Sequence, residues 1–273
     1  MRRLFACLIA MGAMFSDPVS ARDGQSRGAE KPVLPDGGSS DEIIVKALSL
    51  PRDELPINVR WAPVDNTKID IIYERADQYL ACALSKADRN WLRKAVEGSP
   101  ALASTEYAQG WLISTNWGCY PPRGTFAPWN PGMAGQSLID RGILIERTLR
   151  TFVPDASLTA AQTFDPAVRA RFRTVETQHN RYRQNPELSG YIVAACLVQT
   201  QPVLATRLFH AKQGGDLVRG IEQAMLVNSP ECLEGVNQLN VEPTTMRLYL
   251  VDAFYRWVLA VHNVPSLIPE GGA

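Results

Sequence analysis

The sequence predicts an all-α protein of two tandem, disulfide-closed helical repeats, arranged as an αα-type bundle or a short solenoid. Apolar residues recur at spacings of three and four over most of the chain, which is the period of an amphipathic helix. No segment alternates apolar and polar residues for long enough to indicate a sheet. Beyond the N-terminal region, four cysteines form two pairs of nearly equal separation, Cys82 with Cys119 and Cys196 with Cys232.

The N-terminus has the three parts of a secretory signal peptide over residues 1–21. Arg2 and Arg3 form a positive region, residues 4–15 are apolar, and residues 19–21 provide a small-residue cleavage site. The apolar run is too short to span a membrane, which needs roughly 20 residues. We therefore expect export to the periplasm or beyond. A buried N-terminal helix is the alternative.

Cleavage removes Cys7, so the five cysteines become the four that are paired above. An even number of cysteines in an exported chain implies disulfides. No second long apolar run follows, so we expect no membrane span in the mature chain.

The remaining elements follow in chain order. Residues 22–66 combine Gly, Ser, Pro and charge, and we expect a disordered linker and an irregular lead-in there. Residues 67–154 form the first helical repeat and residues 155–186 form a connecting helix. Residues 187–264 form the second repeat and residues 265–273 a tail.

Individual helices within these regions are marked by caps and breaks. In the first repeat we expect a helix from residue 68 to a break near residues 86–88, its continuation, and helices over 99–113 and 136–152. The connecting helix covers 165–184, and the second repeat has helices over 187–199, 201–212, 215–227 and 243–262. Ser99-Pro100 and Asp165-Pro166 each pair a capping residue with proline at the first helical position.

The two repeats end in closing helices that align without a gap. Arg141, Glu146 and Arg150 in the first correspond to Arg247, Asp252 and Arg256 in the second. The shared skeleton is an arginine, apolar pairs, an acid five residues on, and a second arginine. Together with the cysteine spacing, this match indicates an internal duplication.

These closing helices resemble one found in a family of exported helical proteins from alphaproteobacteria. In that family a helix carrying one cysteine leads to a second cysteine and then to a helix like L-R-G-x-L-A-E-x-L-Y-R. Residues 141–146 and 247–256 are similar to it, although Leu248 replaces the Gly and Asp252 the Glu. The resemblance implies export and a helical fold, and it implies no activity.

The repeat selects one of the three pairings that four cysteines allow. If each unit closes its own bridge, the disulfides are Cys82–Cys119 and Cys196–Cys232. Each would stabilise the fold by about 3–4 kcal/mol in the chain-entropy model. The wide spacing of the cysteines does not provide the closely spaced ligand pairs that zinc sites use. A catalytic Cys–His pair needs a free thiolate, which an oxidising compartment disfavours.

The sequence contains no recognisable catalytic, nucleotide-binding or metal-binding motif, and we expect no cofactor and no metal. A net charge of zero and a pI near 6.8 give no basic footprint for nucleic acid. Glu146 and Asp252 lie at equivalent places on apolar helices. They are either a pair of active acids or partners of Arg150 and Arg256, which lie four residues on.

The segment from residue 116 to residue 135 is the candidate functional surface, because it combines aromatic residues with prolines. Its candidate binding residues are Trp117, Tyr120, Phe126 and Trp129. Such loops contact a protein, peptide or glycan partner; the alternative is that the rings only cover the disulfide. We therefore expect an exported binding or interaction module of the cell envelope. The alternative is an envelope-polymer hydrolase with unidentified carboxylates.

Overall fold

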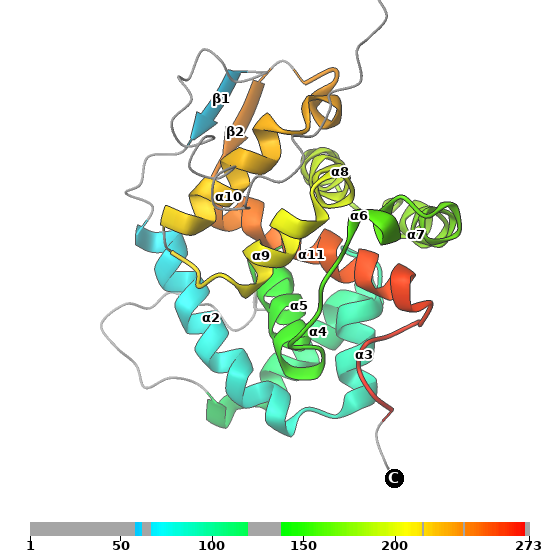
Figure 1. The fold of residues 1–273 in the computed structure, drawn as a ribbon. Coiled ribbons are helices and arrows are strands. Elements are labelled where there is room, and N and C mark those ends of the chain that lie inside the picture. Colours follow the sequence, from blue (N-terminus) through cyan, green and yellow to red (C-terminus); the bar gives the residue numbers. More distant parts are fainter. Residues whose placement is uncertain (1–57, 62–66, 120–137, 215, 237, 271–273) are drawn as a thin grey trace, which may run out of the picture. The chain divides into compact units, whose positions relative to one another are not determined.

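The computed structural model describes residues 58–61, 67–119, 138–214, 216–236 and 238–270 (Figure 1). All of them belong to the second of two units into which the chain divides, residues 38–273. Most of this part is helical, which confirms the predicted all-α class at this level.

The helices and short 3-10 turns follow one another in this order: α2 (Thr67–Lys86), α3 (Arg89–Glu97), α4 (Ala103–Thr115), η2 (Trp117–Cys119), α5 (Leu138–Phe152), α6 (Ala160–Thr163), α7 (Pro166–His179), α8 (Asn185–Thr200), α9 (Pro202–His210), α10 (Asp216–Val227), η3 (Pro230–Leu233) and α11 (Pro243–His262).

One small sheet departs from the prediction of a purely helical chain. Strand β1 (Asn58–Trp61) pairs in parallel with β2 (Gln238–Val241), and Asn58 lies opposite Gln238. The two strands lie side by side beside α10 in Figure 1. Each has four residues, which is too few to show a period of two in the sequence, and their partners are far apart along the chain.

Of two helix starts predicted from a capping residue followed by proline, the structure confirms one and not the other. The Asp165 carboxylate accepts hydrogen bonds from the backbone N–H groups of Ala167 and Val168, so α7 begins at Pro166 as predicted. The start predicted at Ser99-Pro100 is wrong, because α4 begins at Ala103. Ala101 has a φ of 54°, in the left-handed region, and a residue in that conformation cannot continue a right-handed helix.

Helix α11 is the centre of the described fold. It packs against α5, α7, α8, α9 and α10, and every residue from Leu250 to Ala260 is buried (Figure 1). A helix that is buried on all sides lies inside the protein, and this one carries the charged residues Arg247, Asp252 and Arg256 among its buried positions. Trp257 stacks on Phe172 of α7 with ring centroids 4.0 Å apart. Polar side chains that point from α11 are consequently held in the core.

The disulfides have the pairing that the sequence predicts, Cys82–Cys119 and Cys196–Cys232, each with its Cα atoms 5.5 Å apart. The first joins α2 to η2 and the second joins α8 to η3. Each disulfide therefore ties a long helix to a 3-10 turn, with two shorter helices between them in the sequence.

Candidate functional site

The aromatic residues predicted as a binding surface are only partly described. Trp117 lies in η2 and is 56% exposed. Tyr120, Phe126 and Trp129 lie outside the described residues. The predicted surface is therefore represented here by Trp117 alone.

A second set of aromatic residues lies on helices α3 and α4, and sequence reasoning did not select it. The Trp91 ring centroid lies 5.9 Å from that of Tyr107 and 5.5 Å from that of Trp111. Tyr107 and Trp111 lie 6.5 Å apart and are stacked. Tyr107 is 62% exposed and Trp111 40% exposed, whereas Trp91 is half-buried. We call these three residues the aromatic platform.

The helical period explains why the platform faces outward. Tyr107 and Trp111 are four residues apart on α4, so they share one face of that helix. Ala108 and Leu112, which follow each of them by one residue, are buried in the core. The sequence signal that could have identified this surface is an aromatic pair four residues apart, next to the apolar face of the same helix. The sequence does not reveal, however, which face of α4 is covered by α3.

One lysine side chain lies against the platform. The Lys94 ammonium lies 4.6 Å from the centroid of the Trp91 ring, in a cation–π contact. Asn90, Ser104 and Ser114 are exposed on the same two helices. Such an arrangement offers flat aromatic faces, one cation and neutral polar groups, which suits contact with a partner rather than covalent chemistry.

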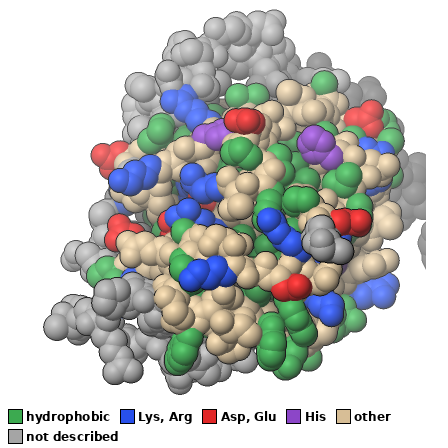
Figure 2. Space-filling view, turned by 90° about the horizontal axis from the view of Figure 1, so that it is seen from below, with side chains coloured by type: hydrophobic (Ala, Val, Ile, Leu, Met, Phe, Trp, Pro, Cys, Tyr) green, Lys and Arg blue, Asp and Glu red, His purple; other side chains and the backbone are tan. Residues whose placement is uncertain are grey.

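One face of the described part mixes both signs of charge. On the face drawn in Figure 2, Lys and Arg side chains and Asp and Glu side chains lie interspersed, with hydrophobic side chains between them. A mixed surface of this kind presents no single-sign field to a polyanion.

Glu146 forms the centre of a buried charge cluster. One carboxylate oxygen accepts hydrogen bonds from Arg247 Nη2 at 2.7 Å and from Arg150 Nη2 at 2.8 Å. The other accepts from the Tyr73 hydroxyl at 2.8 Å. Burial acts to raise the pKa of Glu146, but the charges and hydrogen bonds of Arg247 and Arg150 lower it below its ordinary value.

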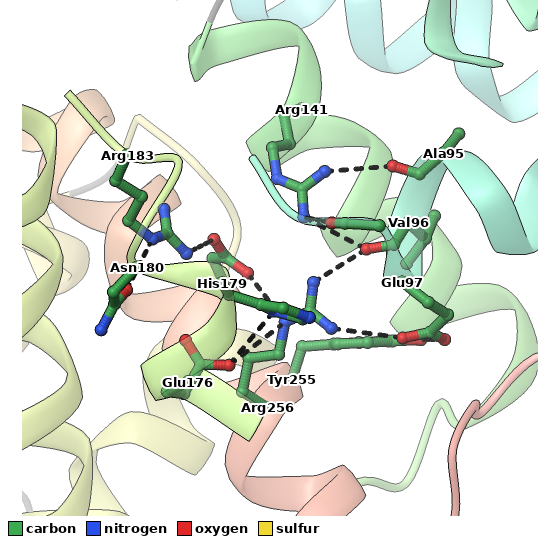
Figure 3. Close-up of polar contacts among 12 residues, drawn as sticks. Ala95, Val96, Glu97, Arg141, Glu176, His179, Asn180, Arg183, Tyr255 and Arg256 are labelled. Carbon is green, nitrogen blue, oxygen red and sulfur yellow. Dashed lines mark hydrogen bonds and ion pairs between the residues drawn. The ribbon is translucent and has the colours of Figure 1, made fainter. Parts of the chain in front are cut away.

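Asp252 lies in a second buried cluster, part of which is drawn in Figure 3. Its Oδ2 accepts a hydrogen bond from Arg183 Nη2 at 2.8 Å, and its Oδ1 lies 3.6 Å from Arg256 Nε. Arg256 also donates to the Val96 carbonyl at 2.9 Å and lies 3.3 Å from a Glu97 oxygen (Figure 3). Burial acts to raise the pKa of Asp252, but Arg183 and the other nearby arginines lower it further than burial raises it.

The two clusters decide between the alternatives left open for Glu146 and Asp252. Each carboxylate is buried and faces an arginine four residues on, as the salt-bridge interpretation predicts. A general acid needs a raised pKa and access to a substrate, whereas both pKa values are lowered. The two acids therefore hold the core together by ion pairing.

Arginines of these clusters also bind the carboxyl ends of two helices. Arg141 donates to the carbonyls of Ala95, Val96 and Gly98 at the end of α3, the first two of which Figure 3 shows. Arg247 donates to the carbonyls of Leu208 and Ala211 at the end of α9. Cations are favoured at helix carboxyl termini, where the last carbonyls lack partners within the helix.

A surface pocket of about 140 Å³ lies between α8, β2 and α11. Its walls are mostly apolar and include Val193, Leu197 and Met246. Its one carboxylate, Glu242, accepts hydrogen bonds from the backbone N–H groups of Thr244 and Thr245 and caps α11. The carboxylate of this pocket is thus already engaged, so the aromatic platform is the better candidate site.

Within the described residues, no three His, Cys, Asp or Glu side chains are grouped so that they could hold a metal ion. In the same residues no single helix is long and apolar enough to cross a membrane. Residues 187–200 of α8 together with α9 meet that requirement by length and composition, with a bend of 107° between them. No protein-family model matches the chain, and no curated protein or solved structure is significantly similar to it.

Proposed function

We propose that the protein is an exported binding module of the cell envelope, which takes a protein, peptide or glycan partner on the aromatic platform. The observation that carries this proposal is the exposure of Tyr107 and Trp111 beside Trp91. Tyrosine and tryptophan dominate the energy of binding surfaces because they offer large, rigid contact areas. Three such rings in contact at a surface are costly to leave in water, so a partner that covers them gains binding energy.

Export is supported by two features. The signal-peptide pattern of residues 1–21 directs the chain out of the cytoplasm. The two disulfides are of the kind that persists in oxidising compartments such as the periplasm. The partner is therefore expected among envelope or extracellular molecules.

We further propose that the module consists of two tandem repeats, residues 67–154 and 187–264. The order α2, α3, α4, η2, α5 is followed by α8, α9, α10, η3, α11. Residues 89–119 and 202–232 align without a gap. Every buried residue of α3 and α4 then has a buried counterpart in α9 and α10.

The arginines of the closing helices support the same duplication. Arg141 of α5 binds the end of α3, and its counterpart Arg247 of α11 binds the end of α9. Arg256 of α11 reaches back to the end of α3, and its counterpart Arg150 of α5 reaches the end of α9. In each closing helix the first arginine thus binds the end of a helix in its own repeat, and the second arginine binds the end of a helix in the other repeat.

Removal of the platform tests the function. We expect the double change Tyr107→Ala and Trp111→Ala to lower capture of a partner from solubilised envelope proteins, or binding to purified envelope polysaccharide, by at least tenfold. Both side chains are exposed, so the melting temperature should stay close to that of the wild type.

The matched control is the double change Phe164→Ala and Tyr182→Ala, which removes exposed rings outside the platform. Loss of binding in this control as well as in the platform variant would indicate nonspecific adhesion. Equal binding by the wild type and the platform variant would overturn the proposal. Whether the wild type binds the envelope proteins or the polysaccharide identifies the class of partner.

A further inference from the structure

Glu222 is a buried carboxyl group without the hydrogen bonds and ion pairs that Glu146 and Asp252 have. It lies on α10, its side chain is 0% exposed, and neither oxygen accepts or donates a hydrogen bond among the described residues. Glu146, by contrast, binds two arginines and a tyrosine. An ionised carboxylate that is buried without hydrogen bonds costs several kcal/mol or more, so such a group takes up a proton instead.

The charged groups around α10 do not supply a close counter-ion. Arg247 of α11 attracts the charge of Glu222, and so does Arg219 of α10, whereas Glu242 at the start of α11 repels it. Arg247 is already engaged by Glu146 and by the carbonyls of Leu208 and Ala211. The remaining charged or titratable groups on the neighbouring elements are Arg207 and His210 of α9, Glu231 of η3, Asp216 of α10, and Asp252, Arg256 and His262 of α11. Burial outweighs these charges and raises the pKa of Glu222 well above its ordinary value.

The other half of the proposed duplication has a neutral residue at this place. Gln109 of α4 aligns with Glu222, and it is also buried. Its amide Nε2 donates a hydrogen bond to the Ala95 carbonyl at 3.1 Å. Leu208 aligns with Ala95, so the backbone around the two positions corresponds as well. A protonated Glu222 has nearly the same shape as the Gln109 side chain and, like it, can donate a hydrogen bond. This comparison rests on the proposed tandem repeat.

We propose that Glu222 is a proton-binding site in the core, which makes the packing of α10 against α9 and α11 depend on the external pH. With its proton in place, the side chain is a neutral group that the apolar interior accepts. When the proton is lost, the carboxylate must reach water, and α10 can supply that access only by leaving its neighbours. An exported protein would meet such pH changes directly, without the buffering of the cytoplasm.

The direction of the effect follows from linkage. The unfolded chain releases this proton at about pH 4.5, while the folded protein keeps it to a much higher pH. The folded state therefore binds more protons above pH 4.5, and its stability falls as the pH rises. The unfolding constant is expected to gain up to about tenfold for each pH unit in this interval, which equals about 1.4 kcal/mol per unit.

The change Glu222→Gln tests the proposal. The amide cannot ionise, so we expect the ratio of the wild-type to the variant unfolding constant to lie about fourfold above its low-pH value at pH 5 and to grow severalfold per unit up to pH 8. Urea unfolding of the full mature chain at each pH measures it. The control Glu74→Gln makes the same change at an exposed position of α2, and we expect a ratio that does not vary with pH.

Two further measurements test the protonation of Glu222 separately from its equivalence to Gln109. A protonated carboxylic acid gives its own infrared band, so the wild type at pH 7 should show one that Glu222→Gln lacks. Gln109→Glu should create a pH dependence in the first half if the two positions are equivalent. A Glu222→Gln ratio that is constant from pH 5 to pH 8, or the absence of the band, would overturn the proton site. A pH-independent Gln109→Glu variant would refute only the equivalence.

Discussion

Replacement of Arg247 with methionine is the most informative test of the buried clusters. The guanidinium is fully buried and donates to both oxygens of Glu146, which is itself fully buried. Two further hydrogen bonds, to the carbonyls of Leu208 and Ala211, are 2.9 and 3.0 Å long. Methionine keeps the apolar stem and removes only the charge and the donors.

The magnitude follows from what the variant leaves behind. Breaking a buried ion pair by removing one partner costs about 3–5 kcal/mol, because the other charge stays buried without compensation. Arg150 and Tyr73 still bind Glu146, which places the expected loss near the lower end, at about 3 kcal/mol. That is a large share of the roughly 5–15 kcal/mol that stabilises a typical domain.

Urea unfolding at pH 7 measures the loss, and a double-mutant cycle identifies its cause. In a Glu146→Gln background no charge is left to compensate, so Arg247→Met should cost at least about 1 kcal/mol less than in the wild type. Arg169→Met, at an exposed position of α7, should change the free energy of unfolding by less than about 0.5 kcal/mol. An equal cost of Arg247→Met in both backgrounds would refute the ion-pair argument.

Two other changes probe the helix packing and the second cluster. A Cβ atom at Gly142 would lie 2.6 Å from the Leu248 Cβ, so Gly142→Ala should destabilise the protein by about 1–3 kcal/mol in urea unfolding. Gly110 has open space and should gain up to about 1 kcal/mol as alanine, and the reverse order would contradict the packing. The lowered pKa of Asp252 means that its ion pairs stabilise the fold above about pH 4 and are lost as the pH falls. Asp252→Asn should therefore lower stability at pH 7 and flatten the acid-induced loss in unfolding titrations, and an unchanged acid profile would contradict this.

The features that the sequence predicts well depend on residues close together in the chain. Helix α11 has the predicted bounds, and Asp165 caps α7 as predicted. The contact between Glu146 and Arg150 follows from their spacing of four residues on one helix. These features need no knowledge of what lies across the core, because local spacing and backbone geometry decide them.

The features that the sequence does not predict depend on contacts between distant segments. The pairing of β1 with β2 joins two four-residue strands that lie far apart in the sequence. The partner of Glu146 on α11, Arg247, is set by the packing of α5 against α11, which no local pattern encodes. The aromatic platform was missed for the same reason, since exposure of Tyr107 and Trp111 depends on how α3 covers α4.

The exchange of charges between α5 and α11 bears on how the two proposed repeats depend on each other. In a solenoid each repeat contacts only its neighbours and adds stability of its own. Here the acid of α5 is neutralised by Arg247 of α11, and the positive charge of Arg141 of α5 acts on the acid of α11. Gly142 lets the two helices approach so closely that these groups share one interior. Either proposed repeat alone would leave a buried carboxylate short of an arginine, so the described chain is expected to fold as one cooperative unit.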